Sequence, residues 1–70
     1  MITKRQAELL TIIKAFWRDH QRSPSLKEMM AAMGYRHHGG VLRILAVLEH
    51  EAEIVVLRPG RKGGLTVEVI

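Results

Sequence analysis

The sequence predicts an α+β fold in which three helices precede a two-stranded β-hairpin, within a single domain of residues 1–70. Apolar residues recur every three or four positions in three successive stretches, as one buried helix face requires. Beyond residue 53 the apolar pattern becomes short and alternating, which is typical of strands. With 47% apolar residues, a chain of 70 residues can bury one small core. This order of elements is that of a winged helix–turn–helix.

The first helix is expected over about residues 4–20. Thr3 and Gln6 have the spacing of a capping box, in which each side chain bonds the backbone N–H of the other residue. The helix ends before Pro24, because the residue before a proline avoids the helical region. Its apolar stripe consists of Leu9, Leu10, Ile12, Ile13, Phe16 and Trp17.

A second, shorter helix begins after Ser25, which forms a capping box with Glu28, and ends at Met33. Gly34 is suited to the left-handed conformation that closes a helix, and Tyr35 can pack back on the preceding turn. The buried stripe is expected to consist of Leu26, Met29, Met30 and Met33.

A third helix is expected over about residues 39–51, with a poorly marked start. Residues 37–40 (HHGG) include no Ser, Thr, Asp or Asn cap, and each glycine inside a helix costs about 1 kcal/mol. Residues 54–57 and 65–70 then predict two strands, joined by a glycine-rich, basic tip over 58–64. The apolar residues of the third helix are Val41, Leu42, Ile44, Leu45, Val47 and Leu48.

Side chains near these elements are expected to have ordinary structural roles. Phe16 is expected in the core and Trp17 at its edge, with the indole N–H reaching water. Ser23 is assigned to a turn, and Glu49 to a solvated helix end.

Composition excludes several classes of protein. The chain has no cysteine, so disulfides, cysteine-based zinc sites and thiol catalysis are excluded. No apolar run approaches the length of a membrane span, and we expect a cytoplasmic protein. The adjacent His37 and His38 diverge, and His20 and His50 stand alone, so neither a metal nor another cofactor is expected. The chain also lacks a phosphate-binding loop, and we expect no enzyme activity.

Basic residues are concentrated near the two ends of the chain, although the net charge is only +4. Residues 1–22 carry five basic and two acidic side chains, and 53–70 carry three basic and two acidic ones. Residues 23–52 carry three of each sign. This distribution favours a polyanionic partner that contacts the flanks of the domain.

Four segments in this order resemble the N-terminal DNA-binding domain of LexA-type SOS repressors: 3–6 (TKRQ), 23–29 (SPSLKEM), 33–36 (MGYR) and 45–48 (LAVL). The resemblance continues into the hairpin and covers nearly the whole chain in register. It implies a transcription regulator, phage or bacterial, whose third helix enters the major groove of double-stranded DNA. LexA-type repressors also carry a self-cleaving protease with a Ser-Lys pair, and nothing in these 70 residues matches it.

The resemblance also implies that the first two turns of the third helix read base edges. The family typically has Ser-Pro-Asn, small residues and two acidic residues there, whereas residues 37–43 of this chain are HHGGVLR. The family's operator therefore does not transfer. The candidate nucleic-acid-binding residues are Arg36, His37, His38, Gly39, Gly40, Arg43, Arg58, Arg61 and Lys62.

Each candidate in the third helix has a plausible chemistry. Arg43 can fork onto the two major-groove acceptors of guanine, and His37 and His38 can donate to phosphates or base acceptors. Two interpretations apply to Gly39 and Gly40. They let backbone amides approach a phosphate closely, or they form a flexible loop that breaks the turn.

The basic hairpin tip also allows two interpretations of its role. Arg58, Arg61 and Lys62 suit a minor-groove or phosphate contact, and they also suit an ordinary solvated tip. Further phosphate contacts at helix starts are expected from Lys4, Arg5 and Arg36.

Leu42 departs from the family pattern, in which its position is polar and faces outward. Three interpretations of Leu42 follow: it is buried after a shift of the helix, it contacts another protein, or it contacts a thymine methyl group. Leu42, Val69 and Ile70 are candidates for a homodimer or partner contact. The rival function is accordingly a protein-binding winged-helix module, such as an antirepressor, inhibitor or adaptor.

Overall fold

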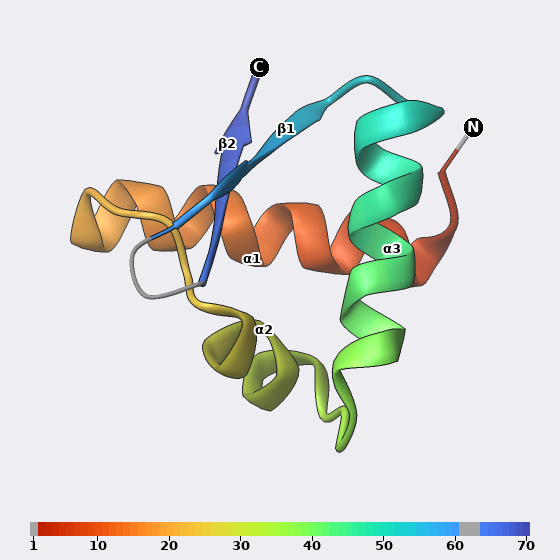
Figure 1. The fold of residues 1–70 in the computed structure, drawn as a ribbon, viewed down its shortest axis with the longest axis horizontal. Coiled ribbons are helices and arrows are strands. Elements are labelled where there is room, and N and C mark those ends of the chain that lie inside the picture. Colours follow the sequence, from red (N-terminus) through yellow and green to blue (C-terminus); the bar gives the residue numbers. More distant parts are fainter. Residues whose placement is uncertain (1, 61–63) are drawn as a thin grey trace.

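The computed structural model describes residues 2–60 and 64–70. Helix α3 crosses α1, α2 packs beside both, and the hairpin of β1 and β2 lies against α1 and α3 (Figure 1). The predicted winged helix–turn–helix is confirmed, with element boundaries within one or two residues of those expected. The elements are α1 (Lys4–His20), α2 (Leu26–Met33), α3 (His38–His50), β1 (Val55–Pro59) and β2 (Leu65–Val69).

Helix α1 begins and ends through local hydrogen bonds. The Thr3 hydroxyl accepts from the Gln6 N–H at 3.2 Å, and the Gln6 side chain accepts from the Thr3 N–H at 2.8 Å. At the other end Gln21 adopts a left-handed conformation, with φ of 56°, and its N–H bonds the Trp17 carbonyl. A non-glycine residue therefore closes the helix before Pro24 is reached.

The helix–turn–helix is built from α2 and α3. The predicted capping box of Ser25 and Glu28 opens α2, and Gly34 closes it with φ of 75°. The Tyr35 N–H then bonds the Met30 carbonyl at 2.9 Å, which turns the chain back on α2. Helix α3 begins one residue earlier than expected, and the His37 side chain makes no capping hydrogen bond.

The core is one buried cluster to which all five elements contribute. Four of the six apolar residues of α3 are buried, and β1 and β2 each add one valine. Phe16 was expected in the core, and this is wrong: its half-buried ring lies 4.3 Å from the ring of His20, between centroids. The buried face of α1 is centred on Leu9 and Ile13, which leaves Phe16 at its margin. The core residues are Leu9, Ile13, Met29, Met33, Val41, Ile44, Leu45, Leu48, Val55 and Val67.

The hairpin is antiparallel, with Leu57 opposite Val67 and Val55 opposite Val69. At its tip the Gly60 N–H bonds the Gly64 carbonyl at 2.7 Å. The predicted contact residues Arg61 and Lys62 lie outside the described residues. No helix in the described part of the chain is long and apolar enough to cross a membrane.

Candidate nucleic-acid interface

The predicted base-reading residues lie together at the start of α3, on its exposed side. Arg36, His37, His38 and Gly39 are exposed, and Arg43 is exposed one turn further on. The first turn of α3 contains no acidic residue. Among the residues that the structure describes, Arg36 and Arg43 have no ion-pair partner. This end of α3 therefore presents uncompensated positive charge to solvent.

The two glycines of this segment lie in different surroundings. Both glycines belong to α3, so the interpretation that they form a flexible loop is wrong. A Cβ on Gly40 would lie 3.3 Å from Cδ2 of Tyr35, which accounts for a residue without a side chain there. A Cβ on Gly39 would meet nothing within 4 Å. The backbone at Gly39 is therefore open to a ligand from outside.

Leu42 lies on the same open side of α3, with 43% of its surface exposed. The reading in which a helix shift buries Leu42 is therefore wrong. Val41 and Leu45 are fully buried on the adjacent, core-facing side, and they fix the rotation of the helix about its axis. This placement leaves Leu42 accessible to another protein or to DNA.

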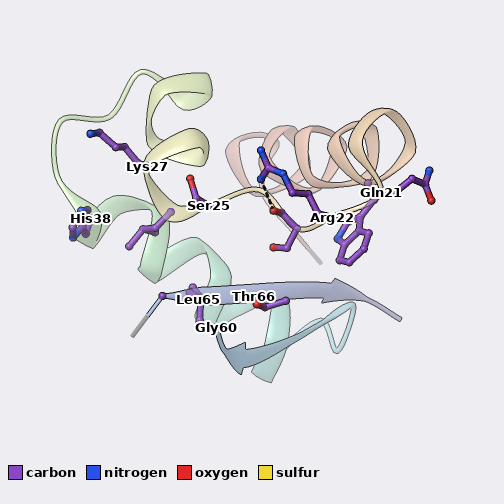
Figure 2. Close-up of a pocket in the computed structure, with 12 residues that line it drawn as sticks. Gln21, Arg22, Ser25, Lys27, His38, Gly60, Leu65 and Thr66 are labelled. Atoms are coloured by element: carbon purple, nitrogen blue, oxygen red, sulfur yellow. Dashed lines mark hydrogen bonds between the residues drawn. The ribbon is translucent and has the colours of Figure 1, made fainter. Parts of the chain in front are cut away.

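A groove of about 800 Å³ runs between the helix–turn–helix and the tip end of the hairpin (Figure 2). The start of α2 and His38 of α3 line one side of it, and hairpin residues line the other. Arg22 and Lys27 are its charged lining residues among those described, and both are basic. The groove thus joins the start of α2, the start of α3 and the hairpin, and among the described residues Lys27 has no ion-pair partner there. The lining residues are Trp17, Gln21, Arg22, Ser23, Ser25, Leu26, Lys27, His38, Gly60, Gly64, Leu65 and Thr66.

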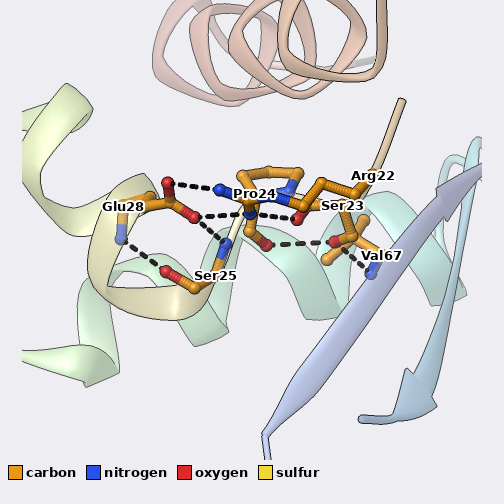
Figure 3. A network of polar contacts seen from close by, with 6 residues as sticks. All are labelled: Arg22, Ser23, Pro24, Ser25, Glu28 and Val67. Atoms are coloured by element: carbon orange, nitrogen blue, oxygen red, sulfur yellow. Dashed lines mark hydrogen bonds and ion pairs between the residues drawn. The ribbon is translucent and has the colours of Figure 1, made fainter. Parts of the chain in front are cut away.

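One border of this groove is held by an ion pair (Figure 3). The Arg22 guanidinium donates to both carboxylate oxygens of Glu28, at 3.0 and 3.2 Å. Glu28 also accepts from the Ser25 N–H at 2.9 Å. The Arg22 guanidinium and the Ser25 N–H lower the pKa of Glu28 to about 2. Glu28 therefore stays ionised and fixes both Arg22 and the first turn of α2.

Three side-chain hydrogen bonds join the described part of the hairpin to the helices, and all three fall at the rung where Leu57 faces Val67. On β2 the Trp17 indole donates to the Val67 carbonyl, and the Ser23 hydroxyl accepts from the Val67 N–H, both at 2.9 Å. On β1 the Glu49 carboxylate accepts from the Leu57 N–H, also at 2.9 Å. Side chains from α1, the α1–α2 turn and α3 thus hold the two edges of the hairpin.

This attachment corrects three expectations. The Trp17 indole does not reach water, Ser23 does more than shape a turn, and Glu49 is not merely solvated. The physical reason is common to all three. A two-stranded sheet leaves polar backbone groups on both edges, and groups that become partly buried need hydrogen-bond partners.

Two of the predicted phosphate-binding arginines have partners within the fold. Arg5 donates to the Met33 carbonyl at 2.8 Å and to the Glu8 carboxylate at 2.8 Å, and its guanidinium lies over the Tyr35 ring. Arg58 pairs with Glu68 across the hairpin at 3.2 Å. Arg5 thus links α1 to the end of α2, and the charge of Arg58 is partly compensated.

The exposed basic start of α3, the groove and the attached hairpin together define a winged helix–turn–helix DNA-binding domain. The model of the LexA DNA-binding domain family matches residues 1–62. The chain belongs to this family.

Two curated relatives agree with the family match, and each is a LexA repressor. That of Novosphingobium aromaticivorans is 39% identical over 67 residues, which is 96% of this chain and 28% of the relative. That of Granulibacter bethesdensis is 39% identical over 49 residues, which is 70% of this chain and 20% of the relative. No solved structure gives a significant match. The chain thus corresponds to between a fifth and a third of the length of these relatives.

Proposed function

We propose that residues 1–70 form one domain that regulates transcription by binding double-stranded DNA. Helix α3 enters the major groove, and the hairpin lies on the adjacent backbone or minor groove. The observation that carries this proposal is the groove that the start of α2, the start of α3 and the tip end of the hairpin share. A DNA backbone strand that follows it meets Lys27 and the positive end of the α2 dipole. The role is regulatory rather than catalytic, and it is exercised in the cytoplasm, where the DNA lies.

Individual roles follow from exposure and chemistry. Arg43 forks onto a guanine, and His37 and His38 donate to phosphates or bases. Gly39, with open space above its backbone, allows the closest approach to a phosphate. Arg36 binds the backbone at the start of α3.

The hairpin supplies contacts that do not depend on sequence. Arg58, Arg61 and Lys62 neutralise phosphates or enter the minor groove. For Arg61 and Lys62 this role rests on the basic, glycine-rich composition of the tip.

The experiment is a systematic selection of duplexes from a random library, repeated with variants. Arg43→Ala should relax the preference at one base pair, whereas the double variant Arg61→Ala/Lys62→Ala should weaken binding to all duplexes alike. Lys14→Ala, which removes one exposed charge from α1, serves as the control and should do neither. A selection that enriches no sequence, together with unchanged affinity in all three variants, would contradict the proposal.

A second candidate function is a contact with protein, and two exposed apolar side chains favour it. Leu42 is 43% exposed and Ile70 is 78% exposed. A homodimer or partner contact through α3 would use Leu42, and one through the C-terminal strand would use Val69 and Ile70. Sedimentation of the wild type beside Leu42→Asp and Ile70→Asp separates these cases, since only the variant at the contact dissociates the complex.

A further inference from the structure

We infer that Leu42 reads the 5-methyl group of a thymine in the DNA half-site. The inference rests on the proposed function and deepens it, because it assigns part of the sequence preference to one apolar side chain. The exposed side of α3 carries the residues that support the inference. Positions 39, 42, 43 and 46 share this side at helical spacing, and all four residues are exposed.

Leu42 is the only large apolar side chain that α3 exposes among the described residues. Its neighbours on this face, Gly39 and Ala46, are small and leave it projecting. Leu42 and Arg43 are therefore the two side chains that the second turn of α3 presents to solvent. The exposed part of the Leu42 side chain gains no free energy from its contact with water, whereas its burial against a methyl group is favourable.

The charge around Leu42 selects the partner. Arg43 and His38 flank it, and the first acidic residue of α3 is Glu49, whose carboxylate is bound to the Leu57 N–H. The surface around Leu42 thus combines positive charge with one apolar projection. Duplex DNA matches both features, because it is a polyanion and thymine alone among its bases presents a methyl group in the major groove.

Arg43 and Leu42 then divide the recognition between them. Arg43 provides donors for guanine, and Leu42 provides an apolar surface for thymine. The family's two acidic residues at these positions can only accept hydrogen bonds when ionised, so this chain should select different base pairs. The preferred half-site is expected to contain at least one guanine and one thymine whose substitution weakens binding.

Replacement of thymine by deoxyuridine tests the inference without changing the protein. Each thymine of the selected duplex is replaced in turn, which removes one methyl group and leaves the base pairing intact. We expect one position to weaken binding about four-fold, as expected for the burial of one methyl group at about 0.8 kcal/mol. The other positions should change affinity little.

Two variants connect this effect to Leu42. Leu42→Ala should bind the thymine and deoxyuridine duplexes equally, and Leu42→Met, which retains an apolar side chain of similar length, should keep most of the difference. Leu42 lies outside the buried core, so thermal unfolding should confirm that both variants fold.

Three results would overturn the inference while leaving DNA binding intact. The wild type could bind every deoxyuridine duplex as tightly as the parent. The discrimination could persist in Leu42→Ala, which would assign the methyl contact to another residue. Leu42→Asp could dissociate a homodimer while Leu42→Ala leaves the response to deoxyuridine unchanged, which would make this face a protein contact. Absence of binding to any duplex would instead overturn the proposed function itself.

Discussion

The indole Nε1 of Trp17 donates a hydrogen bond to the backbone carbonyl of Val67 at 2.9 Å, and 50 residues of sequence separate the two. Val67 also donates its N–H to the Ser23 hydroxyl, so β2 is held to the helices through both polar groups of one residue. The tip end of the hairpin borders the groove beside α3. The Trp17–Val67 hydrogen bond therefore helps to set the position of the hairpin relative to α3.

Trp17→Phe keeps an aromatic ring and removes the donor. We expect the free energy of unfolding to fall by about 1–2 kcal/mol, because the partly buried Val67 carbonyl loses its partner. DNA affinity should fall while the preferred sequence stays the same, because the hairpin loses one of the three hydrogen bonds that position it and α3 is unchanged. Urea denaturation and duplex titration measure the two effects. Unchanged stability would show that the bond does not hold the hairpin.

The other edge of the hairpin depends on Glu49. Glu49→Ala should destabilise the domain by about 1–2 kcal/mol and speed amide exchange at Leu57, whose N–H loses its acceptor. Glu49→Gln retains a side-chain oxygen and should recover most of both effects. If Glu49→Gln and Glu49→Ala speed amide exchange at Leu57 equally, loss of the Glu49–Leu57 hydrogen bond is not the cause of the faster exchange.

Glu28 should make stability depend on pH in the acid range. The pKa of Glu28 is lowered from 4.5 to about 2 in the folded state, so the unfolded chain binds the proton more readily. The contribution is present in full above about pH 4.5 and is lost as the pH falls towards about 2. Because the side chain is 38% exposed, we expect it to be roughly 1 kcal/mol after solvent screening.

Urea denaturation across this range measures the effect as a difference between proteins. Glu28→Gln keeps a side chain suited to the capping box and should lose less stability than the wild type on acidification. Glu51→Gln removes another exposed carboxylate and serves as the control. Parallel pH profiles for the wild type and Glu28→Gln would contradict the assignment.

Gly39→Ala should separate stability from function. The added methyl group has open space and replaces a poor helix former, so stability should rise by up to about 1 kcal/mol. The same methyl group would stand between the backbone and a phosphate, and DNA affinity should fall. Gly40→Ala is the companion variant, and it should be less stabilising because its Cβ presses on the Tyr35 ring. A stabilised Gly39→Ala with full DNA affinity would rule out close approach at this position.

The helix boundaries could be predicted because their signals are local. Thr3 and Ser25 lie three residues from their capping partners, and Gly34 directly follows the helix that it closes. The exposed start of α3 was predictable for a similar reason, since the buried positions of α3 follow helical periodicity. Fold class and site location therefore follow from short-range patterns.

The attachment of the hairpin could not be predicted in the same way. Ser23 and Val67 are 44 residues apart, and only the folded chain brings them together. Periodicity placed both Phe16 and Trp17 on one stripe but did not say which of them meets β2. One signal was present in the sequence: a lone hairpin needs partners for its edges, and polar side chains close to the apolar stripes were available.

Titration of the wild-type domain with its selected duplex at increasing salt concentrations tests the central claim most directly. If the domain binds DNA through the groove and the basic hairpin, the logarithm of the association constant falls linearly with the logarithm of salt concentration. The expected slope is about −0.9 for each phosphate contacted. Arg61→Ala/Lys62→Ala should make the slope shallower. Absence of measurable duplex binding even at the lowest ionic strength would contradict the account.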